Sequence, residues 1–514
     1  MSLIALALLT VMMSVAVIFG WRSWRSRKLY QPLRSVPSPP QHWLLGNVPQ
    51  ISAAIKQKQF FKLLFDWSEQ YGPAYVFWVG KPVLILSQPT VVEDTIVRGM
   101  RDGSLVRSKR IQKAWNEISS SILLGTSGAE WKWRRKAWNP EFNDSGLAPH
   151  TEVVHAACSQ ITAKLKQADP SKAVQVDPLF VELTMRVIAS LLLGIPVERQ
   201  ENSPDGPPLD IQKTYQAMSV IGYRFLRVAT GEKIWKKYLP TPASRDYWAA
   251  RSYLEKLLAP YVDSALERGE KHRGKTEGNL KDSASIKASK PSMLDKIAEK
   301  EPRYTRETLI AESIEMLIAG TDTTAHTLSF AVGELASNPN VFKKAQSLVD
   351  QVWEQHGELS TDALKDLNYI RAIIKETLRL YSVASGSTSL EATRQTTIQE
   401  ITVPPGTQIS WSMLGAGRDA STYPEPDQFR PERWLEKGKE NASVPMIDFG
   451  SGYHRCLGEQ LAMLEATIML AQMIHTFEWE LVNGKVTLDK LQQNLLIYPT
   501  DGMPIRVKRR EFEA

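Results

Sequence analysis

The sequence predicts a mainly α-helical fold with a small β region, preceded by a single membrane-spanning helix. Apolar residues recur at helical spacing through most of the chain after residue 86, which favours α-helices. Strand-like patterns are confined to residues 74–86 and 398–413. Residues 1–20 carry no charge and are rich in Leu, Ala, Val, Ile and Met, as in a segment that crosses a bilayer.

The composition of the 514-residue chain is that of a folded protein, with 43% hydrophobic and 23% charged residues. The net charge of +7 is compatible with an anionic membrane surface or an acidic partner protein. Lys and Arg residues form no stripe with interleaved aromatic residues, so binding of nucleic acid is not expected. Cys158 and Cys456 are the two cysteines, and their different contexts predict no disulfide framework.

The N-terminal segment predicts a membrane anchor at residues 1–20, because twenty helical residues rise about 30 Å and can cross the hydrocarbon core. Two tryptophans and four cations follow directly, within residues 21–28. Aromatic residues and positive charge after the span predict that the rest of the chain is cytosolic. A cleaved secretory signal is the alternative, but its positive charges would precede the apolar stretch. Residues 21–47 form a basic linker whose later, Pro-rich part predicts an extended connector.

Three further segments give simpler expectations. Residues 211–228 have apolar positions at helical spacing and predict a helix. Residues 267–290 are rich in Lys, Gly and Ser, which predicts a mobile, solvated loop. Residues 398–403 and 408–413 flank a Pro-Pro-Gly turn, which predicts a β-hairpin.

Residues 449–458 read Phe-Gly-Ser-Gly-Tyr-His-Arg-Cys-Leu-Gly and place Cys456 among glycines and cations. His454 and Arg455 beside the thiol favour the thiolate, which is the form that binds metals. A helical pattern starts after Gly458, and the N-terminus of that helix would also favour negative charge at the sulfur. The alternative is a small buried thiol without chemistry, the common state of a lone cysteine.

A long helix is predicted between Thr305, which can cap it, and Asn338-Pro339, which stops it. Its middle, residues 319–324, reads Ala-Gly-Thr-Asp-Thr-Thr, although Gly, Thr and Asp disfavour helix interiors. Such local inconsistency indicates a functional notch lined by hydroxyls and one carboxylate. A Thr-rich kink without chemistry is the alternative.

Two further pairs of residues indicate a function only when they are considered together with these motifs. Trp131 and Arg135 are spaced to share one helix face, where an indole N–H and a guanidinium could both donate to one carboxylate. Glu376 and Arg379 are opposite charges three residues apart on a helix. Each pair is also common on a solvated helix surface.

Together these motifs resemble those of the cytochrome P-450 superfamily, in the same order along the chain. Residues 449–458 resemble its heme-ligand loop, and residues 319–324 its oxygen-activation motif. The resemblance extends over nearly the whole chain, and Phe429-Arg-Pro-Glu-Arg433 adds the arginine that the family pairs with Glu376 and Arg379. It implies a triangular, mostly α domain with a small β region over residues 48–514.

The resemblance also implies a role for each motif residue. Cys456 would be the axial thiolate ligand of heme b, whose iron activates O2. Asp322 and Thr323 would relay protons to dioxygen, and Ala319 and Gly320 would leave room for it. Glu376, Arg379 and Arg433 would form a buried structural network. The remaining cofactor-binding positions that it implies are Trp131, Arg135, Arg394, Phe449, His454 and Gly458.

A heme-thiolate monooxygenase follows from this resemblance, acting on a lipophilic small molecule such as a terpenoid, polyketide or alkaloid of secondary metabolism. No flavin or nicotinamide motif is apparent, so electrons would come from NADPH through a cytochrome reductase at an endoplasmic reticulum membrane, with cytochrome b5 as an additional partner. Arg455 and Lys132 are candidates for the docking face. The alternatives are an isomerase or dehydratase that needs no reductase, and a heme-binding sensor without turnover.

His454 stands where most members of the superfamily have Arg. The side chain of His can donate one hydrogen bond to a heme propionate, but its charge depends on pH. We therefore expect heme retention to weaken above neutral pH more steeply than in a His454→Arg variant. The turn at residues 382–389 also departs from the family, because Ser382 follows Tyr381 where many members have Pro.

Overall fold

The computed structural model describes residues 13–14, 25–119, 122–197, 206–276, 291–357, 359, 362–384, 389–435 and 446–511. The expected anchor at residues 1–20 therefore lies outside the described residues, except for Met13 and Ser14. Across the described ranges, we find no helix with the length and apolar character needed to span a membrane.

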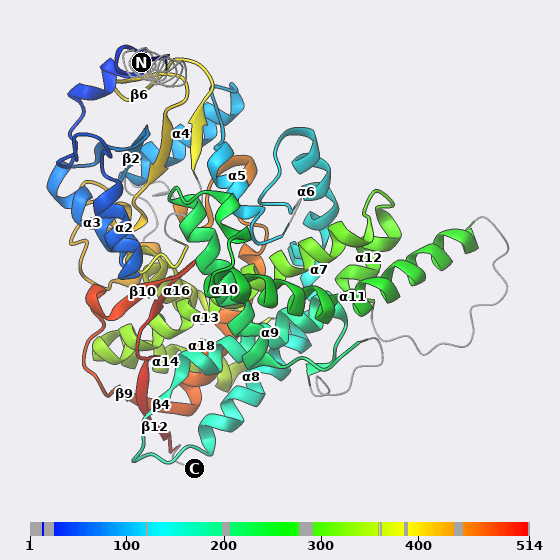
Figure 1. The fold of residues 1–514 in the computed structure, drawn as a ribbon. Helices are drawn as coiled ribbons and strands as arrows, with labels where there is room; N and C mark the ends of the chain where they lie inside the picture. Colours follow the sequence, from blue (N-terminus) through cyan, green and yellow to red (C-terminus); the bar gives the residue numbers. More distant parts are fainter. Residues whose placement is uncertain are drawn as a thin grey trace.

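The fold is mainly α-helical with a small β region, as the sequence predicts. In Figure 1, strand β2 and helices α2 and α3 lie on the left side of the molecule. Helices α6, α7, α11 and α12 lie on the right side, and α13 lies near the centre. The α-helices of the described residues are α2 (Val48–Lys56), α3 (Phe60–Tyr71), α4 (Pro89–Arg101), α5 (Lys109–Trp115), α6 (Gly128–Phe142), α7 (Asp144–Leu147), α8 (Thr151–Lys166), α9 (Val176–Leu193), α10 (Ile211–Ala229), α11 (Pro242–Thr276), α12 (Met293–Lys300), α13 (Arg306–Ser337), α14 (Pro339–His356), α15 (Ala363–Asp366), α16 (Asn368–Leu380), α17 (Met413–Gly417) and α18 (Glu459–Thr476).

The β region consists of one five-stranded sheet and three smaller pairings. The sheet has the order β1-β2-β8-β5-β3, and the others are β4-β12-β9, β10-β11 and β6-β7. The strands are β1 (Ala74–Val79), β2 (Lys81–Leu86), β3 (Leu105–Arg107), β4 (Val174–Gln175), β5 (Leu390–Ala392), β6 (Thr396–Ile398), β7 (Ile401–Val403), β8 (Gln408–Trp411), β9 (Phe477–Leu481), β10 (Leu491–Gln493), β11 (Ile497–Pro499) and β12 (Pro504–Arg509).

The predicted hairpin across the Pro-Pro-Gly turn is wrong. β7 pairs with β6, which precedes it, and β8 instead runs parallel to β2 and antiparallel to β5. The prolines and glycine therefore connect two sheets and do not close one hairpin. A buried strand such as β8 pairs with strands that are distant in the sequence. The local sequence pattern does not reveal those partners.

Helix α13 forms the centre of the helical region, and its ends are those predicted. Thr305 caps it with a reciprocal pair of bonds to Thr308, and Asn338 ends it before Pro339 opens α14. It packs along α9 over much of its length, and most of its residues are buried in the main hydrophobic core. A helix buried on all sides can line a cavity in its middle only where small residues interrupt the core.

One other expectation needs correction. Residues 267–276 continue α11 and are not a loop, while residues 277–290 lie outside the described ranges. In the linker, Tyr30, Leu33 and Val36 are buried in the core of the five-stranded sheet. The predicted helix at residues 211–228 is present as α10.

Candidate active site

An apolar cavity lies between α13, the segment before α18, and α6. It has a volume of about 210 Å³ and is lined mainly by apolar side chains from α9, α13, α16 and α18. The predicted residues that line it are Trp131, Arg135, Ala319, Gly320, Thr323, Phe449, His454, Cys456 and Gly458. The fold thus brings together three motifs that are more than a hundred residues apart in the sequence.

The notch in α13 is real, and its exposed side faces this cavity. Between Leu309 and Leu335, only Ala319, Gly320 and Thr323 are not fully buried, and all three line the cavity. The hydroxyl of Thr323 donates to the carbonyl of Ala319 at 2.8 Å, which satisfies the hydroxyl proton while its oxygen stays at the cavity wall. The helix continues through this point without a break, so the Thr-rich run is not a kink that ends it.

Gly320 allows close packing of two helices, in addition to leaving space in the cavity. A Cβ atom at this position would lie 2.9 Å from Cγ1 of Ile188 on α9, well inside van der Waals contact. The glycine therefore lets α9 approach α13 closely. At Gly458, by contrast, a Cβ atom would meet no other atom within 4 Å, because this glycine borders the cavity.

Asp322 is not at the cavity, although the resemblance pairs it with Thr323. It is buried on a different face of α13, and its Oδ1 atom has no hydrogen-bond partner among the described residues. Burial raises the pKa of this carboxyl to about 6, opposed by nearby His326 and reinforced by Asp177. Thr323 is thus the member of the pair that reaches the cavity.

The loop that presents Cys456 is closed by backbone contacts. The N–H of Cys456 donates to the carbonyl of Phe449 at 2.7 Å, and Gly450 and Gly452 take positive φ angles of 73° and 64°. Such angles favour glycine, so both residues suit the turn. Cys456 is exposed and lines the cavity, and helix α18 begins three residues later, at Glu459.

The expected bias of Cys456 toward thiolate is not supported by its protein surroundings alone. Burial raises the pKa of this thiol, and the Gly458 N–H, Arg135 and Arg455 only partly oppose it. Arg455 is tied to Glu459 at 2.5 and 2.7 Å. A coordinated metal ion deprotonates a thiol outright. A bound metal ion would therefore supply the positive charge that the Cys456 thiolate needs.

Cationic side chains gather at the edge of the cavity that α6 covers. Arg135 lines it, and no described residue forms an ion pair with its guanidinium. Trp131 lies one turn earlier, with its ring 4.1 Å from the ring of His454 between centroids. Arg107 on β3 completes the group and donates to the carbonyls of Leu124 and Thr126 at 2.8 and 2.9 Å.

His454 favours the neutral form in this group of protein residues. Arg107 donates to its Nδ1 atom at 2.8 Å. Burial and the charges of Arg107 and Arg135 together lower the pKa of His454 to about 3. The neutral ring keeps one N–H as a donor. The expected loss of heme above neutral pH concerns a ring beside propionates, whose negative charge would raise this pKa, and it stays a prediction.

Arg394 does not reach the cavity. Its side chain is 58% exposed and pairs with Asp102 at 3.5 Å, while it donates to the Asp102 carbonyl at 3.0 Å. Arg107 lines the cavity in place of Arg394. A single Arg in a three-residue strand gives no local signal, so the sequence did not reveal Arg107.

Two carboxyl groups at the cavity were also missed. Glu315 lies one turn before Ala319 and accepts from the N–H groups of Leu123 and Leu124 at 2.8 and 2.9 Å. Burial raises its pKa to about 8, so it is largely protonated at neutral pH. Glu465 on α18 lies where neither carboxyl oxygen has a hydrogen-bond partner among the described residues, and burial raises its pKa well above the ordinary value. Helical spacing from Ala319 and Leu461 could have identified both.

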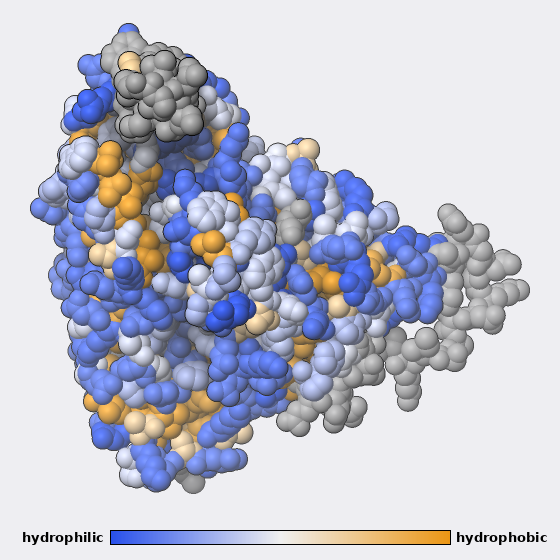
Figure 2. All heavy atoms as spheres, in the orientation of Figure 1, coloured by the Kyte–Doolittle hydropathy of each residue, from blue (hydrophilic) through white to orange (hydrophobic). Residues whose placement is uncertain are grey.

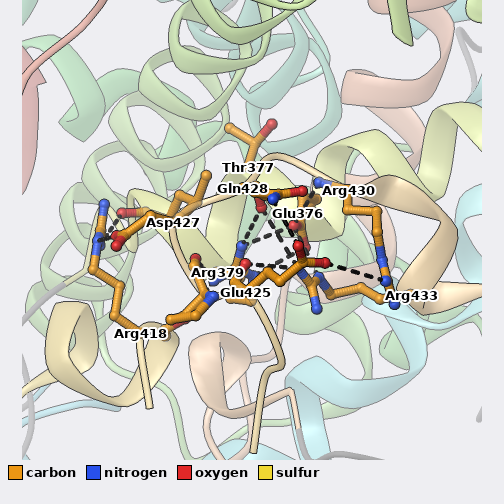
Figure 3. Close-up of polar contacts among 12 residues, drawn as sticks. Glu376, Thr377, Arg379, Arg418, Glu425, Asp427, Gln428, Arg430 and Arg433 are labelled. Atoms are coloured by element: carbon orange, nitrogen blue, oxygen red, sulfur yellow. Dashed lines mark hydrogen bonds and ion pairs between the residues drawn. The ribbon is translucent and has the colours of Figure 1, made fainter. Parts of the chain in front are cut away.

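Figure 3 shows the predicted network of Glu376, Arg379 and Arg433, with the peptide segment of Glu425 and Gln428 wrapped around it. Glu376 is fully buried and accepts from Arg379 at 2.8 and 3.0 Å and from Arg433 at 3.0 Å. Trp434 donates to the same carboxylate at 2.9 Å. The network ties α16 to the 3-10 helix Pro431–Trp434 and so holds the segment that leads to the Cys456 loop.

The residues at the cavity fit a heme. The walls are apolar enough for a macrocycle, Cys456 offers a sulfur ligand, and Arg135 offers a cation without an anionic partner. Arg107, Arg135, Trp131 and neutral His454 would donate hydrogen bonds to the propionates. Neutral, protonated Glu315 and Glu465 add no negative charge that would oppose them.

This donor set limits the class of protein. A lone cysteine, facing a hydroxyl-bearing notch in a long buried helix, is suited to ligate an iron on one side while leaving the other side for a reactant. The fold and the cavity therefore define a heme-thiolate protein.

Comparison with known proteins gives the family. The family model described as cytochrome P450 matches residues 36–506. Among curated proteins, the chain is 24% identical to cytochrome P450 3A14 of Cavia porcellus, over 93% of this chain and 92% of that protein. It is 26% identical to cytochrome P450 76C4 of Arabidopsis thaliana, over 88% and 87%, and 25% identical to flavonoid 3'-monooxygenase of Petunia hybrida, over 95% and 93%. The chain belongs to the cytochrome P450 family, as the motifs predicted, and is classed as a cytochrome P450 monooxygenase.

Proposed function

We propose that this enzyme inserts one oxygen atom of O2 into a lipophilic small molecule of secondary metabolism, such as a terpenoid, polyketide or alkaloid. The reaction would be a hydroxylation, an epoxidation or a multi-step oxidation. The observation that carries the proposal is that Cys456 and Thr323 line one apolar cavity, from the α18 loop and from the notch of α13. Bound heme b would supply the chemistry of O2 activation, with electrons that reach it from NADPH through a reductase.

The protein's own contribution is to exclude water, orient the substrate and control protons. Leu378, Val383 and Ile188 are apolar wall residues, which favours a substrate without charge. The hydroxyl of Thr323 is a polar group of the α13 notch at the cavity, and it would pass a proton that Asp322 supplies from behind. Cys456 would bind the iron, and the cations at the α6 edge would hold the propionates.

We further propose that residues 1–20 anchor the chain in the endoplasmic reticulum membrane and that residues 21–47 link this anchor to a cytosolic catalytic domain, residues 48–514. Large apolar side chains near the linker support contact with a membrane, since Trp43 is 86% exposed and Leu44 and Leu45 are also exposed. Figure 2 shows a mostly hydrophilic face with apolar side chains in separate patches, at the upper left and also at the lower end of the view. NADPH–cytochrome reductase and cytochrome b5 are the proposed electron partners, and exposed Lys132 and Arg455 are candidate docking residues.

The proposal is tested by Thr323→Ala in the reconstituted enzyme with reductase. We expect NADPH consumption to continue while product per NADPH falls about tenfold or more and peroxide is released, because proton transfer of this kind contributes at least that much. Thr321→Ala is the matched control, since the Thr321 hydroxyl bonds a carbonyl of the same helix at 2.7 Å but does not line the cavity. Equal coupling in wild type and Thr323→Ala would remove the proton role.

The same preparation separates the two alternatives. Turnover of a hydroperoxide without NADPH or reductase would indicate an isomerase or dehydratase. Binding of apolar compounds, seen as type-I spectral shifts, without oxidation of any of them would indicate a sensor. A monooxygenase gives both a type-I shift and a product that depends on NADPH, reductase and O2.

A further inference from the structure

A second, smaller cavity lies behind the α13 notch, and we call it the rear chamber. It has a volume of about 10 Å³ between α10, α13 and the segment around β11, and Tyr215, Asp322, His326 and Tyr498 line it. Asp322 and Thr323 are neighbours in the sequence, but one borders the rear chamber and the other borders the heme cavity. Helix α13 is therefore the wall between the two spaces.

Asp322 is the group in the rear chamber that is poised to accept a proton. Its Oδ1 atom is buried and has no hydrogen-bond partner among the described residues, which is costly for a carboxylate. The chamber has room for about one water molecule, which needs polar groups around it to be held. If the Asp322 carboxyl donates its proton toward the notch, it must afterwards regain one. Asp322 lines the rear chamber, so the new proton would come from that side.

His326 lies one helical turn after Asp322, on the same face of α13. Its Nδ1 atom is 2.8 Å from Oδ1 of Asp177 on α9, and Ser329 donates to the same oxygen at 2.7 Å. With Nδ1–H held by a carboxylate, Nε2 is the nitrogen that takes up and releases a proton. Asp177 thus stabilises the imidazolium and fixes the orientation of the ring.

The far side of the rear chamber leads outward. The rings of His326 and Tyr498 lie 5.8 Å apart between centroids. The Tyr498 hydroxyl accepts from Nζ of Lys58 at 3.1 Å and bonds to Gln492 at 3.1 Å. Lys58 and Gln492 are only half-buried, so this edge of the chamber is where solvent protons can enter.

We propose that His326, held by Asp177, is the proton donor that recharges Asp322 through the rear chamber. One proton leaves Nε2 of the imidazolium and neutralises the Asp322 carboxylate, directly or through one water molecule. The imidazole then regains a proton from solvent at the Tyr498–Lys58 edge, so protons balance and no electron is transferred. The inference rests on the proposed roles of Asp322 and Thr323 and adds the source of their protons.

The charges around His326 support a proton that can move. Tyr215 on α10, Asp322 on α13 and Tyr498 on β11 line the chamber with His326, and Asp177 on α9 contacts the His326 ring from outside it. Asp177 raises the pKa of His326 above its ordinary value, against the effect of burial. Burial raises the pKa of Asp322 to about 6. Asp177 therefore favours the imidazolium form of His326, which is the form that can donate a proton, and burial favours the protonated form of Asp322.

The main test is His326→Gln in the holoenzyme with reductase. Glutamine can keep a hydrogen bond to Asp177 but cannot carry a proton as an imidazolium. We expect product per NADPH to fall roughly tenfold at pH 7.5, and to recover as the pH falls toward 6 and below, where Asp322 gains its proton from solvent. The matched control is His475→Gln, because His475 forms the same kind of pair with Asp350 at 2.9 Å, away from both cavities. It should couple as the wild type does.

A second variant and a spectroscopic readout keep the proposal testable if His326→Gln folds poorly. Asp177→Asn keeps the geometry but removes the charge that stabilises the imidazolium. It should move the alkaline limb of the coupling profile about one pH unit or more lower. NMR titration of 13C-labelled histidines, eight in the chain, should show the His326 signal with a raised pKa in wild type and a lower one in Asp177→Asn.

The outcomes are distinguishable. If His326→Gln couples like the wild type at every pH while Asp322→Asn and Thr323→Ala uncouple, His326 is only a tie between α13 and α9, and the proposed function stands. A loss in His326→Gln that is equal at all pH values and follows lowered thermal stability also overturns the inference. If Asp322→Asn and Thr323→Ala do not uncouple either, the proposed proton route itself is wrong.

Discussion

Thr323 and Asp322 face different spaces because successive residues of an α-helix point about 100° apart. The motif alone suggests that both act at one place, but helical periodicity allows only one of them to reach the heme cavity. The same periodicity, followed backward from Ala319, leads to Glu315 on the cavity side. Side-chain direction was therefore predictable from spacing, whereas the neutral state of His454 was not, because it depends on Arg107 from a distant strand.

Glu315 makes stability depend on pH. Its pKa is raised from 4.5 to about 8 in the folded chain by burial, so between these values the unfolded chain has lost a proton that the folded chain keeps. Stability then falls as pH rises through this window, by about 1.4 kcal/mol per pH unit. We expect Glu315→Gln to lose clearly less stability than the wild type between pH 5 and 8, measured as thermal midpoints at each pH.

The control for this prediction is Glu478→Gln, which changes an exposed carboxyl on β9. Its stability should follow the pH slope of the wild type. A Glu315→Gln slope equal to that of the wild type would show that Glu315 ionises normally in the folded chain.

Helix α13 shows which features of an element its sequence determines. Thr305 and Asn338-Pro339 set its ends through local capping and the missing N–H of proline, so both ends were predictable. The strands are different, because β8 obtains its partners from residues 83–86 and 390–391, far away in the chain. The position of α9 against Gly320 is likewise a tertiary fact. The family motif accounts for Gly320 only by the space that it leaves in the cavity. It does not account for the close packing of α9.

Gly320→Ala should therefore destabilise the fold through helix packing. Its Cβ atom would lie 2.9 Å from Ile188, which costs about 1–3 kcal/mol when a well-packed core must shift. The cost should be smaller in an Ile188→Ala background, as a double-mutant cycle would measure. Gly458→Ala is the matched control, since its Cβ atom meets nothing within 4 Å and φ is −90°. If Gly320→Ala costs the same with and without Ile188, close helix packing is not the reason for this glycine.

At the scale of the whole molecule, the proposed membrane anchor and the proposed orientation of the domain rest on residues 1–28, most of which fall outside the described ranges. The basic cluster after the apolar stretch predicts a cytosolic domain. The docked segment from Tyr30 to Val36 would then hold the sheet close to the membrane. The family and the fold were accessible from sequence because several motifs agree in order, while the substrate was not, because apolar wall residues carry no specific signal.

The orientation of the chain is testable at Asn143, which is exposed and begins an Asn-Asp-Ser glycosylation acceptor. In a cytosolic domain this asparagine stays unmodified, so endoglycosidase should not change the mobility of the microsomal protein. The positive control moves the cations ahead of the apolar stretch, with Ser2→Arg, Leu3→Arg, Arg22→Gln, Arg25→Gln, Arg27→Gln and Lys28→Gln. The inverted chain should become glycosylated. Glycosylation of the wild type would contradict the proposed orientation.

The central claim is that Cys456 binds heme iron in the cavity opposite the α13 notch, and the reduced-CO difference spectrum tests it most directly. The wild-type protein should show the absorption band typical of thiolate-ligated heme, and Cys456→Ala should lose that band. Cys158→Ala is the control, because Cys158 is fully buried on α8 in the hydrophobic core and should leave the band unchanged. A Cys456→Ala protein that kept the thiolate-type band would contradict the account.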